Sequence, residues 1–294
     1  MPNNPHMPID YLLEIGVEEL PVNDLNSAIR QIEDFLPKIL LEKNVSFTKI
    51  EINGTPRRLS IQVKDLFLNI IDSVEVVRGP AVKHAYDLDG NPTKAAEGFA
   101  RGQGVMIEDL EVRNIDGGKY VVAIKSVADI NLSELLTIIA PEIIGNLRFN
   151  KSMRWLSNDN TITFSRPIRW IVSLLGKDVL PFSFGGIDAG RESYGLRSCS
   201  NDRVDILEAS SYEPTMVSQN IVINVDERRS IIKSTGQELA NTVGGCMLDD
   251  DLLLSEVANL VESPKVFIAE FDKRYLHMPQ EILMAVMKKH QRYF

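Results

Sequence analysis

Residues 11–36 read YLLEIGVEELPVNDLNSAIRQIEDFL, and two hydrophobic periods meet inside this stretch. The run up to Val17 is almost continuously apolar, which is typical of a strand with both faces buried. Pro21 and Asn23 then mark the start of a helix. The apolar residues that follow recur at spacings of three and four: Leu25, Ile29, Ile32 and Leu36. The stretch therefore predicts a buried strand and an amphipathic helix, which Pro37 should kink or restart.

Alternating apolar residues farther along the chain predict three hairpins. The first turns at Asn53-Gly54, the second turns at residues 116–118, and the third follows the apolar run Ile168–Leu175. Helical composition marks residues 94–101 and 132–144 between them. This mixture of strands and helices predicts an α+β fold with a mixed or antiparallel sheet.

Beyond residue 201 the pattern of the sequence changes. Helical spacing dominates in residues 226–241, 250–261 and 280–290, with one strand-like run at 265–271. We therefore expect two domains, an α+β body over residues 1–200 and a mainly helical region over residues 201–294.

Composition and charge exclude several classes of protein. The 294 residues carry a formal charge of −9, which argues against indiscriminate nucleic-acid binding but leaves room for a local basic surface. Cys199 and Cys246 form no motif, so we expect no disulfide scaffold, and a reducing cytoplasm fits. Residues 1–10 are polar, and no apolar run of about 18 residues occurs, so we expect neither a signal peptide nor a membrane span.

No self-contained catalytic centre is visible in the sequence. It contains no phosphate-binding glycine loop, dinucleotide fingerprint or nucleophile elbow. None of the histidines has the spacing that would place two of them on one helix face for a metal. Glu14, Glu18 and Glu19 could form an acid/base pair or a metal cradle, but acids before a helix start more often interact with its dipole. We therefore expect no catalytic residue and no metal site in this chain.

Arginines beside aromatic residues stand out from this background. Residues 148–170 hold five basic residues against one acidic residue, and both tryptophans directly follow an arginine. Guanidinium groups pair with phosphates and aromatic rings stack on unpaired bases, so this stretch suits RNA. The alternative is that the tryptophans anchor a core and the arginines form internal ion pairs. In a strand, neighbouring side chains point to opposite faces, so Arg169 and Trp170 cannot both contact the same ligand.

Two further groups of basic residues are candidates for phosphate contacts. Arg57 and Arg58 follow the first predicted turn, where a solvated hairpin end is an equally good interpretation. At the other end of the chain, residues 288–294 join three fixed positive charges to Tyr293 and Phe294.

Short motifs spread over the chain resemble those of a known family. The chain is similar to the N-terminal part of the beta subunit of the bacterial-type, two-subunit glycyl-tRNA synthetase, over about residues 9–294. The motifs are LLEIGVEELP at 12–21, TPRRL at 55–59, RGP at 78–80, AAEGFARG at 95–102, MRW at 153–155, RPIRW at 166–170 and HQRYF at 290–294. Val17 stands where the family usually has Thr, and YGLRS at 194–198 differs from the family's Gly-His-Arg-Phe but retains Arg197.

The resemblance implies that a separate alpha subunit activates glycine with ATP and Mg²⁺, and that this chain itself holds no cofactor. It implies that the beta subunit binds tRNA(Gly) in a cytoplasmic α2β2 assembly, with no role for DNA or a membrane. The front part should resemble the editing-type domain of the large subunit of phenylalanyl-tRNA synthetase. The family's beta subunit continues well beyond the HQRYF motif, so we expect a helical region truncated at its C-terminal end and a chain that is inactive alone. The candidate tRNA-binding residues are Arg57, Arg58, Arg154, Trp155, Arg166, Arg169, Arg197, Lys288, Lys289 and Arg292.

Two other functions stay open. The chain could be a structural docking module for the alpha subunit, with RNA held by domains that follow, and the acidic total favours this. It could also retain hydrolytic editing of mischarged tRNA, although the sequence names no nucleophile for that reaction.

Overall fold

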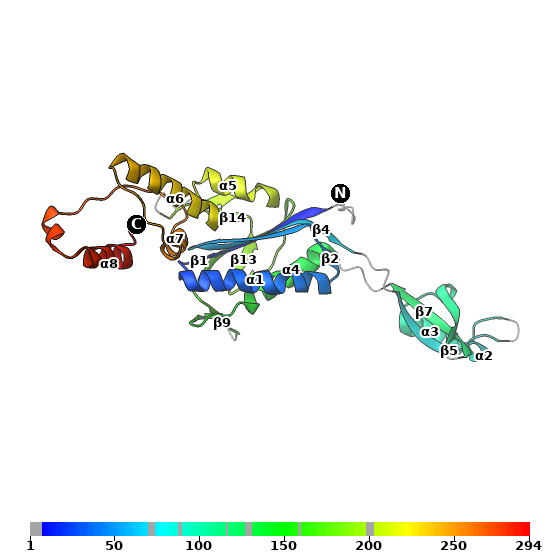
Figure 1. The fold of residues 1–294 in the computed structure, drawn as a ribbon. Helices are drawn as coiled ribbons and strands as arrows, with labels where there is room; N and C mark the ends of the chain where they lie inside the picture. Colours follow the sequence, from blue (N-terminus) through cyan, green and yellow to red (C-terminus); the bar gives the residue numbers. More distant parts are fainter. Residues whose placement is uncertain are drawn as a thin grey trace. The chain divides into compact units, whose positions relative to one another are not determined.

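A computed structural model describes residues 8–69, 74–87, 90–115, 117–126, 131–157, 160–197 and 203–294. Its contacts divide the chain into two compact units (Figure 1). The first unit combines residues 1–68 with residues 132–294, and the second unit is residues 69–131. This division does not follow the predicted boundary near residue 200, because the first unit includes both the front sheet and the helices beyond it.

An eight-stranded sheet forms the centre of the first unit. Strand β1 (Ile9–Val17) lies between β4 (Arg58–Leu68) and β10 (Ile168–Leu175) and is antiparallel to both. The sheet also includes β2 (Val45–Ser46), β3 (Lys49–Thr55), β11 (Asp178–Val179), β12 (Ser183–Phe184) and β13 (Ile187–Gly190). Among the strand pairs of the described residues, only β10 and β13 run parallel. The predicted α+β class with a mixed sheet is confirmed, whereas the likeness to the phenylalanyl-tRNA synthetase domain stays a prediction.

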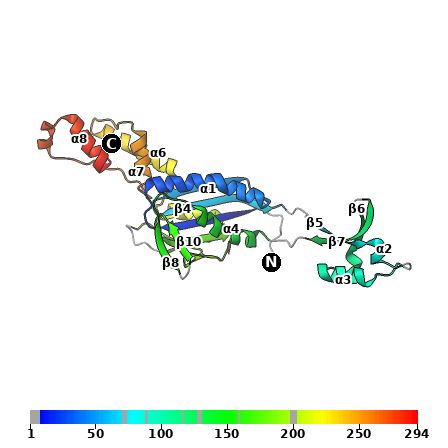
Figure 2. The same cartoon turned by 90° about the horizontal axis from the view of Figure 1, so that it is seen from below.

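Helices cover both faces of this sheet (Figures 1 and 2). On one face, α1 (Val22–Glu42) and α4 (Leu132–Asn146) pack against Leu13 and Ile15. On the other face, α5 (Tyr212–Ser218) packs over Leu12. Successive residues of β1 therefore enter two different cores, which is why its sequence is a continuous apolar run rather than an alternating one.

The first hairpin exists, but its predicted turn position is wrong. Asn53 pairs with Ser60 and Gly54 with Leu59 inside the ladder, and the chain turns at Pro56 and Arg57. Gly54 serves close packing instead of a turn, because a Cβ atom added there would lie 2.6 Å from Cδ1 of Leu25 on α1. A glycine in a strand can mark such a close approach, which sequence reasoning cannot distinguish from a turn.

Helix α1 runs through Pro37 without a restart. Leu36 and Leu40 are each 1% exposed, so the core holds the helix on both sides of the proline. Tertiary packing of the apolar face thus outweighs the hydrogen bond that proline removes. Of the two predicted alternatives, the restart at Pro37 is therefore wrong, and the kink stays a prediction.

The rear of the first unit is mainly helical, as the spacing predicts. It contains a hairpin of β14 (Glu192–Tyr194) and β15 (Arg203–Asp205), followed by η2 (Ala209–Ser211), α5, α6 (Val225–Thr242), α7 (Asp251–Ala258), η3 (Lys273–His277) and α8 (Gln280–Gln291). Asn224 and Asp250 cap the starts of α6 and α7 with their side chains. Residues 265–271 form no strand, because their backbone pairs with no other strand, so that prediction is wrong.

The second unit is a small sheet covered by short helices. Strands β5 (Val74–Ala81), β7 (Gly118–Ser126) and β6 (Leu110–Ile115) lie in that order and are antiparallel. The other elements are α2 (Val82–Ala85), α3 (Lys94–Gln103) and η1 (Ile107–Asp109). The predicted hairpin at residues 116–118 and the helix at 94–101 are both confirmed, although Asp116 lies outside the described residues.

The described part of the chain contains no helix that is both long enough and apolar enough to cross a bilayer.

Candidate nucleic-acid interface

Trp170 is a core anchor and lies directly against Gly16. The two residues pair across β1 and β10, and a Cβ atom added to Gly16 would lie 1.9 Å from two atoms of the indole ring. Trp170 is 5% exposed, and its Nε1 donates a hydrogen bond to the Glu14 carboxylate. The ring therefore fills a core position and presents no face to an unpaired base.

Arg58 lies in the interior beside Trp170. It is fully buried, and its Nε lies 2.8 Å from Oε1 of Glu262. Its other nitrogens donate to the backbone oxygen of Tyr194 at 2.9 Å and to Oγ of Ser193 at 3.2 Å. The Glu14 carboxylate lies 3.7 Å away. The position of Arg58 does not fit the predicted RNA contact, because no surface that RNA could reach includes it.

Two carboxylates keep the Arg58 charge in place. Burial alone lowers the pKa of Arg58, but Glu14 and Glu262 outweigh it and hold the pKa above its ordinary value. Burial also raises the pKa of the neighbouring Tyr212, with the Glu14 carboxylate adding to the effect. Both tendencies favour a charged arginine and a neutral tyrosine, so the group is a structural ion-pair network.

Arg228 is a second buried arginine, which sequence reasoning missed. Its guanidinium donates to the backbone oxygens of Ala258, Val222, Ile223 and Gly54 at 2.7, 2.7, 2.9 and 2.8 Å. Burial lowers its pKa to about 10, so it remains charged at neutral pH. One feature of the sequence could have revealed its burial. Arg228 lies four residues before the buried Ile232, and hence on the packed face of α6.

The structure brings three of the predicted arginines together around Glu18. Arg169 lies 3.4 Å from Glu18, and Arg197 lies 3.4 Å from Glu18 and 3.7 Å from Glu19. Arg57 joins them from the β3–β4 turn, where it donates to the Gly195 backbone oxygen at 3.3 Å. Burial lowers the pKa of Arg57, and Arg58 and Arg197 add to this effect. We call Glu18, Glu19, Arg57, Arg169 and Arg197 the Glu18 cluster.

The other candidates lie elsewhere in the fold. Arg154 is exposed on β8 (Met153–Ser157), which pairs with β9 (Asn160–Phe164). Arg166 is half-buried between β9 and β10. The side chain of Trp155 lies outside the described residues. Near the C-terminus, Lys288 pairs with Asp250 and Arg292 with Glu256, while Lys289 is exposed.

The three acids near Gly16 are occupied by cations and hydrogen-bond donors. Glu14 accepts from Trp170 and Ser193, and Glu18 and Glu19 pair with arginines. Within the described ranges, no three His, Cys, Asp or Glu side chains gather as metal ligands would. The arrangement suits charge balance and the binding of anions more than acid/base chemistry.

Comparison with known proteins gives one consistent family. A profile described as glycyl-tRNA synthetase beta subunit matches residues 11–294. The glycine--tRNA ligase beta subunit of Desulforamulus reducens is 39% identical over 97% of this chain, and that of Lactobacillus gasseri is 42% identical over the same share. A chloroplastic/mitochondrial glycine--tRNA ligase of Arabidopsis thaliana is 39% identical over 98% of this chain. The chain spans 41% of each bacterial relative's length and 27% of the plant relative's length.

The contact between Gly16 and Trp170 predicts that adding one methyl group at Gly16 lowers the stability of the protein strongly. Gly16→Ala should destabilise the protein by about 1–3 kcal/mol or more, because the indole cannot move without disturbing the Glu14 network. Gly145→Ala on α4 is the matched control, because its added Cβ would make an ordinary contact at 3.7 Å. Urea unfolding followed by circular dichroism measures both, and equal midpoints would contradict the proposed clash.

Arg58 and Arg169 make a second matched pair. Arg58→Met leaves buried carboxylates without their cation and should cost about 3–5 kcal/mol. Arg169→Met removes an exposed ion pair and should change the stability by at most about 1 kcal/mol. The free energy of unfolding in urea measures both variants. A small effect of Arg58→Met would show that the buried network does not hold the fold together.

Proposed function

Since this chain belongs to the glycyl-tRNA synthetase beta-subunit family, we propose that it supports the ATP-dependent attachment of glycine to tRNA(Gly). In this proposal the chain binds tRNA and contacts the alpha subunit, and the alpha subunit activates glycine with ATP and Mg²⁺. The working assembly is a cytoplasmic α2β2 complex. The chain alone does not aminoacylate tRNA.

The observation that carries the proposal is the convergence of Arg57, Arg169 and Arg197 at one end of the central sheet. Arg169 and Arg197 are each 61% exposed, so their guanidinium groups can reach a large partner. Guanidinium groups bind phosphate in a bidentate manner, which favours an RNA backbone as the ligand. Arg154, Arg166 and the basic residues of α8 are further contacts in the proposal.

A second candidate function is supported by the charges within the Glu18 cluster. Glu18 and Glu19 already balance Arg169 and Arg197, and the whole chain carries −9. Mixed charges of this kind are typical of the polar rim of a protein interface. In this candidate the chain docks to the alpha subunit, and RNA is held by other parts of the enzyme.

Binding measured separately for the two partners distinguishes these functions. We expect this chain to co-elute with tRNA(Gly) in size-exclusion chromatography as well as with the alpha subunit. Binding to tRNA(Gly) should weaken as salt rises, because phosphate contacts release counterions. Co-elution with the alpha subunit alone would support the docking function and contradict RNA binding by this chain.

A further inference from the structure

Two sets of accessible cations can be distinguished in the first unit. In the first set each cation has a carboxylate partner: Arg169 and Arg197 with Glu18, Lys288 with Asp250, and Arg292 with Glu256. In the second set no carboxylate of the described ranges lies within ion-pair distance. Its members are Arg30, Arg148, Lys151 and Arg154, which are exposed, and Arg166, which is half-buried. Lys43, Lys265, Lys273 and Lys289 are exposed and also pair with no carboxylate of the described ranges, but they lie after the end of α1 or in the rear of the unit and are not counted in the second set. A cation without a carboxylate can bind a phosphate without first giving up a partner, so the second set is the better anion surface.

Hydrogen bonds and ring contacts hold the second set in one region. Gln31 of α1 donates to the Arg148 backbone oxygen at 2.8 Å and accepts from the Arg148 backbone nitrogen at 2.9 Å. The Phe149 and Phe164 rings lie 4.8 Å apart, which joins the segment after α4 to the end of β9. Arg154 pairs with Thr163 on that same hairpin.

The start of α1 is fixed to this region as well. Ser165, which directly precedes Arg166, donates a hydrogen bond to Asp24. The first half of α1, the segment after α4 and the β8–β9 hairpin therefore contact one another.

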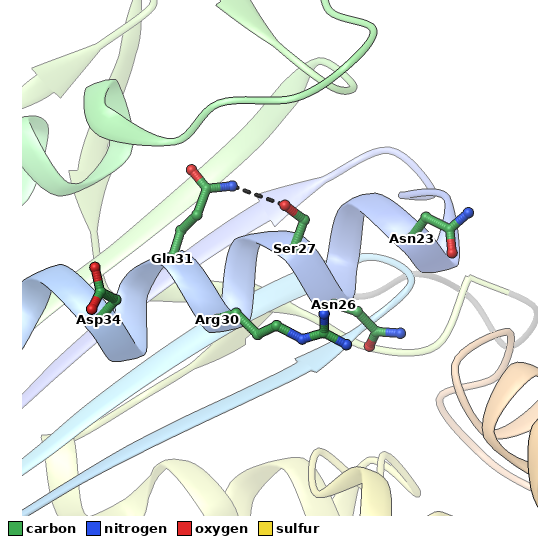
Figure 3. A pocket seen from close by; sticks show the side chains of 6 residues that line it. All are labelled: Asn23, Asn26, Ser27, Arg30, Gln31 and Asp34. Carbon is green, nitrogen blue, oxygen red and sulfur yellow. Dashed lines mark hydrogen bonds between the residues drawn. The ribbon is translucent and has the colours of Figure 1, made fainter.

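A polar groove of about 470 Å³ runs along this part of α1. Figure 3 shows its lining, which consists only of polar side chains: Asn23, Asn26, Ser27, Arg30, Gln31 and Asp34. Asp34 is occupied by Lys38 at 2.8 Å. Small-molecule sites are mostly apolar, so this groove does not fit a buried metabolite. Amide, hydroxyl and guanidinium groups in a row are the groups that proteins use to contact phosphates and riboses.

We propose that the α1 groove and the second set of cations together form the surface that tracks the phosphodiester backbone of RNA. We call this the α1 track. This assignment rests on the proposed function, and it extends the RNA contact from the Glu18 cluster to α1 and the β8–β9 hairpin. Arg30, Arg154 and Arg166 bind phosphates, and the amides and hydroxyl of α1 hydrogen-bond to phosphate and ribose oxygens.

Two charge-matched double variants test the α1 track. The first is Arg30→Gln with Arg154→Gln. The control is Arg203→Gln with Arg274→Gln, because Arg203 pairs with Glu192 at 2.9 Å and Arg274 pairs with Asp272 at 3.5 Å. Both remove two exposed guanidinium groups, but only the control removes groups that already have carboxylate partners. Fluorescence anisotropy with labelled tRNA(Gly) between about 50 and 300 mM salt gives the affinity and its salt slope. Circular dichroism checks that both variants fold.

We expect the α1-track variant to lower the salt slope by about two and to weaken binding by tens of fold at about 0.1 M salt. The control should change the affinity by less than about threefold, since its arginines are already neutralised. Equal losses in both variants would overturn the α1 track in favour of a general charge effect. Unchanged affinity of the α1-track variant, with normal binding by the unmodified chain, would overturn the track and leave the proposed function intact.

The remaining outcomes are also decisive. If the unmodified chain bound no tRNA(Gly), both the proposed RNA binding and the α1 track would fall. If the α1-track variant kept its RNA affinity but no longer co-eluted with the alpha subunit, the groove would be a protein-docking surface and the track would be overturned.

Discussion

The rest of the first unit depends on the burial of the Arg58 charge. An isolated guanidinium in a protein interior costs several kcal/mol, so the fold must supply anions and hydrogen-bond acceptors around it. Glu14 on β1 and Glu262 after α7 supply the charge, and Ser193 and the Tyr194 backbone on β14 supply further acceptors. Segments that are distant in sequence meet at this one side chain. The rear helices are therefore tied to the sheet by electrostatics as well as by apolar packing.

Arg228 strengthens the same connection from the other side. It joins α6 and the end of α7 to the Gly54 backbone on β3, and Thr55 beside it donates to Glu262 at 2.6 Å. With the hairpin end fixed in this way, the neighbouring Arg57 is directed toward Glu18 and the exposed arginines. Arg58 and Arg228 thus fix the hairpin end that carries Arg57.

The sequence predicted the helices and strands far better than it predicted which charged side chains are buried and which are exposed. The run up to Val17 and the periodicity after it located β1 and α1, because burial of apolar faces decides those elements. The short sequence motifs identified the family. Arg57 and Arg58 could not be separated, since adjacent identical residues give no signal for which one enters the core. The turn at Asn53-Gly54 failed because only the position of Leu25 shows why a glycine is required at Gly54.

Footprinting by hydroxyl radicals tests the central claim most directly, which is that RNA lies along α1 and the β8–β9 hairpin. Met153 precedes Arg154 and is 47% exposed, whereas Met106 in the second unit and Met278 before α8 are 71% and 42% exposed. Exposed methionines oxidise readily, and a bound RNA shields those beneath it. The account predicts that tRNA(Gly) lowers the oxidation of Met153 more than that of Met106 or Met278. Unchanged oxidation of Met153 while tRNA(Gly) is bound would contradict it.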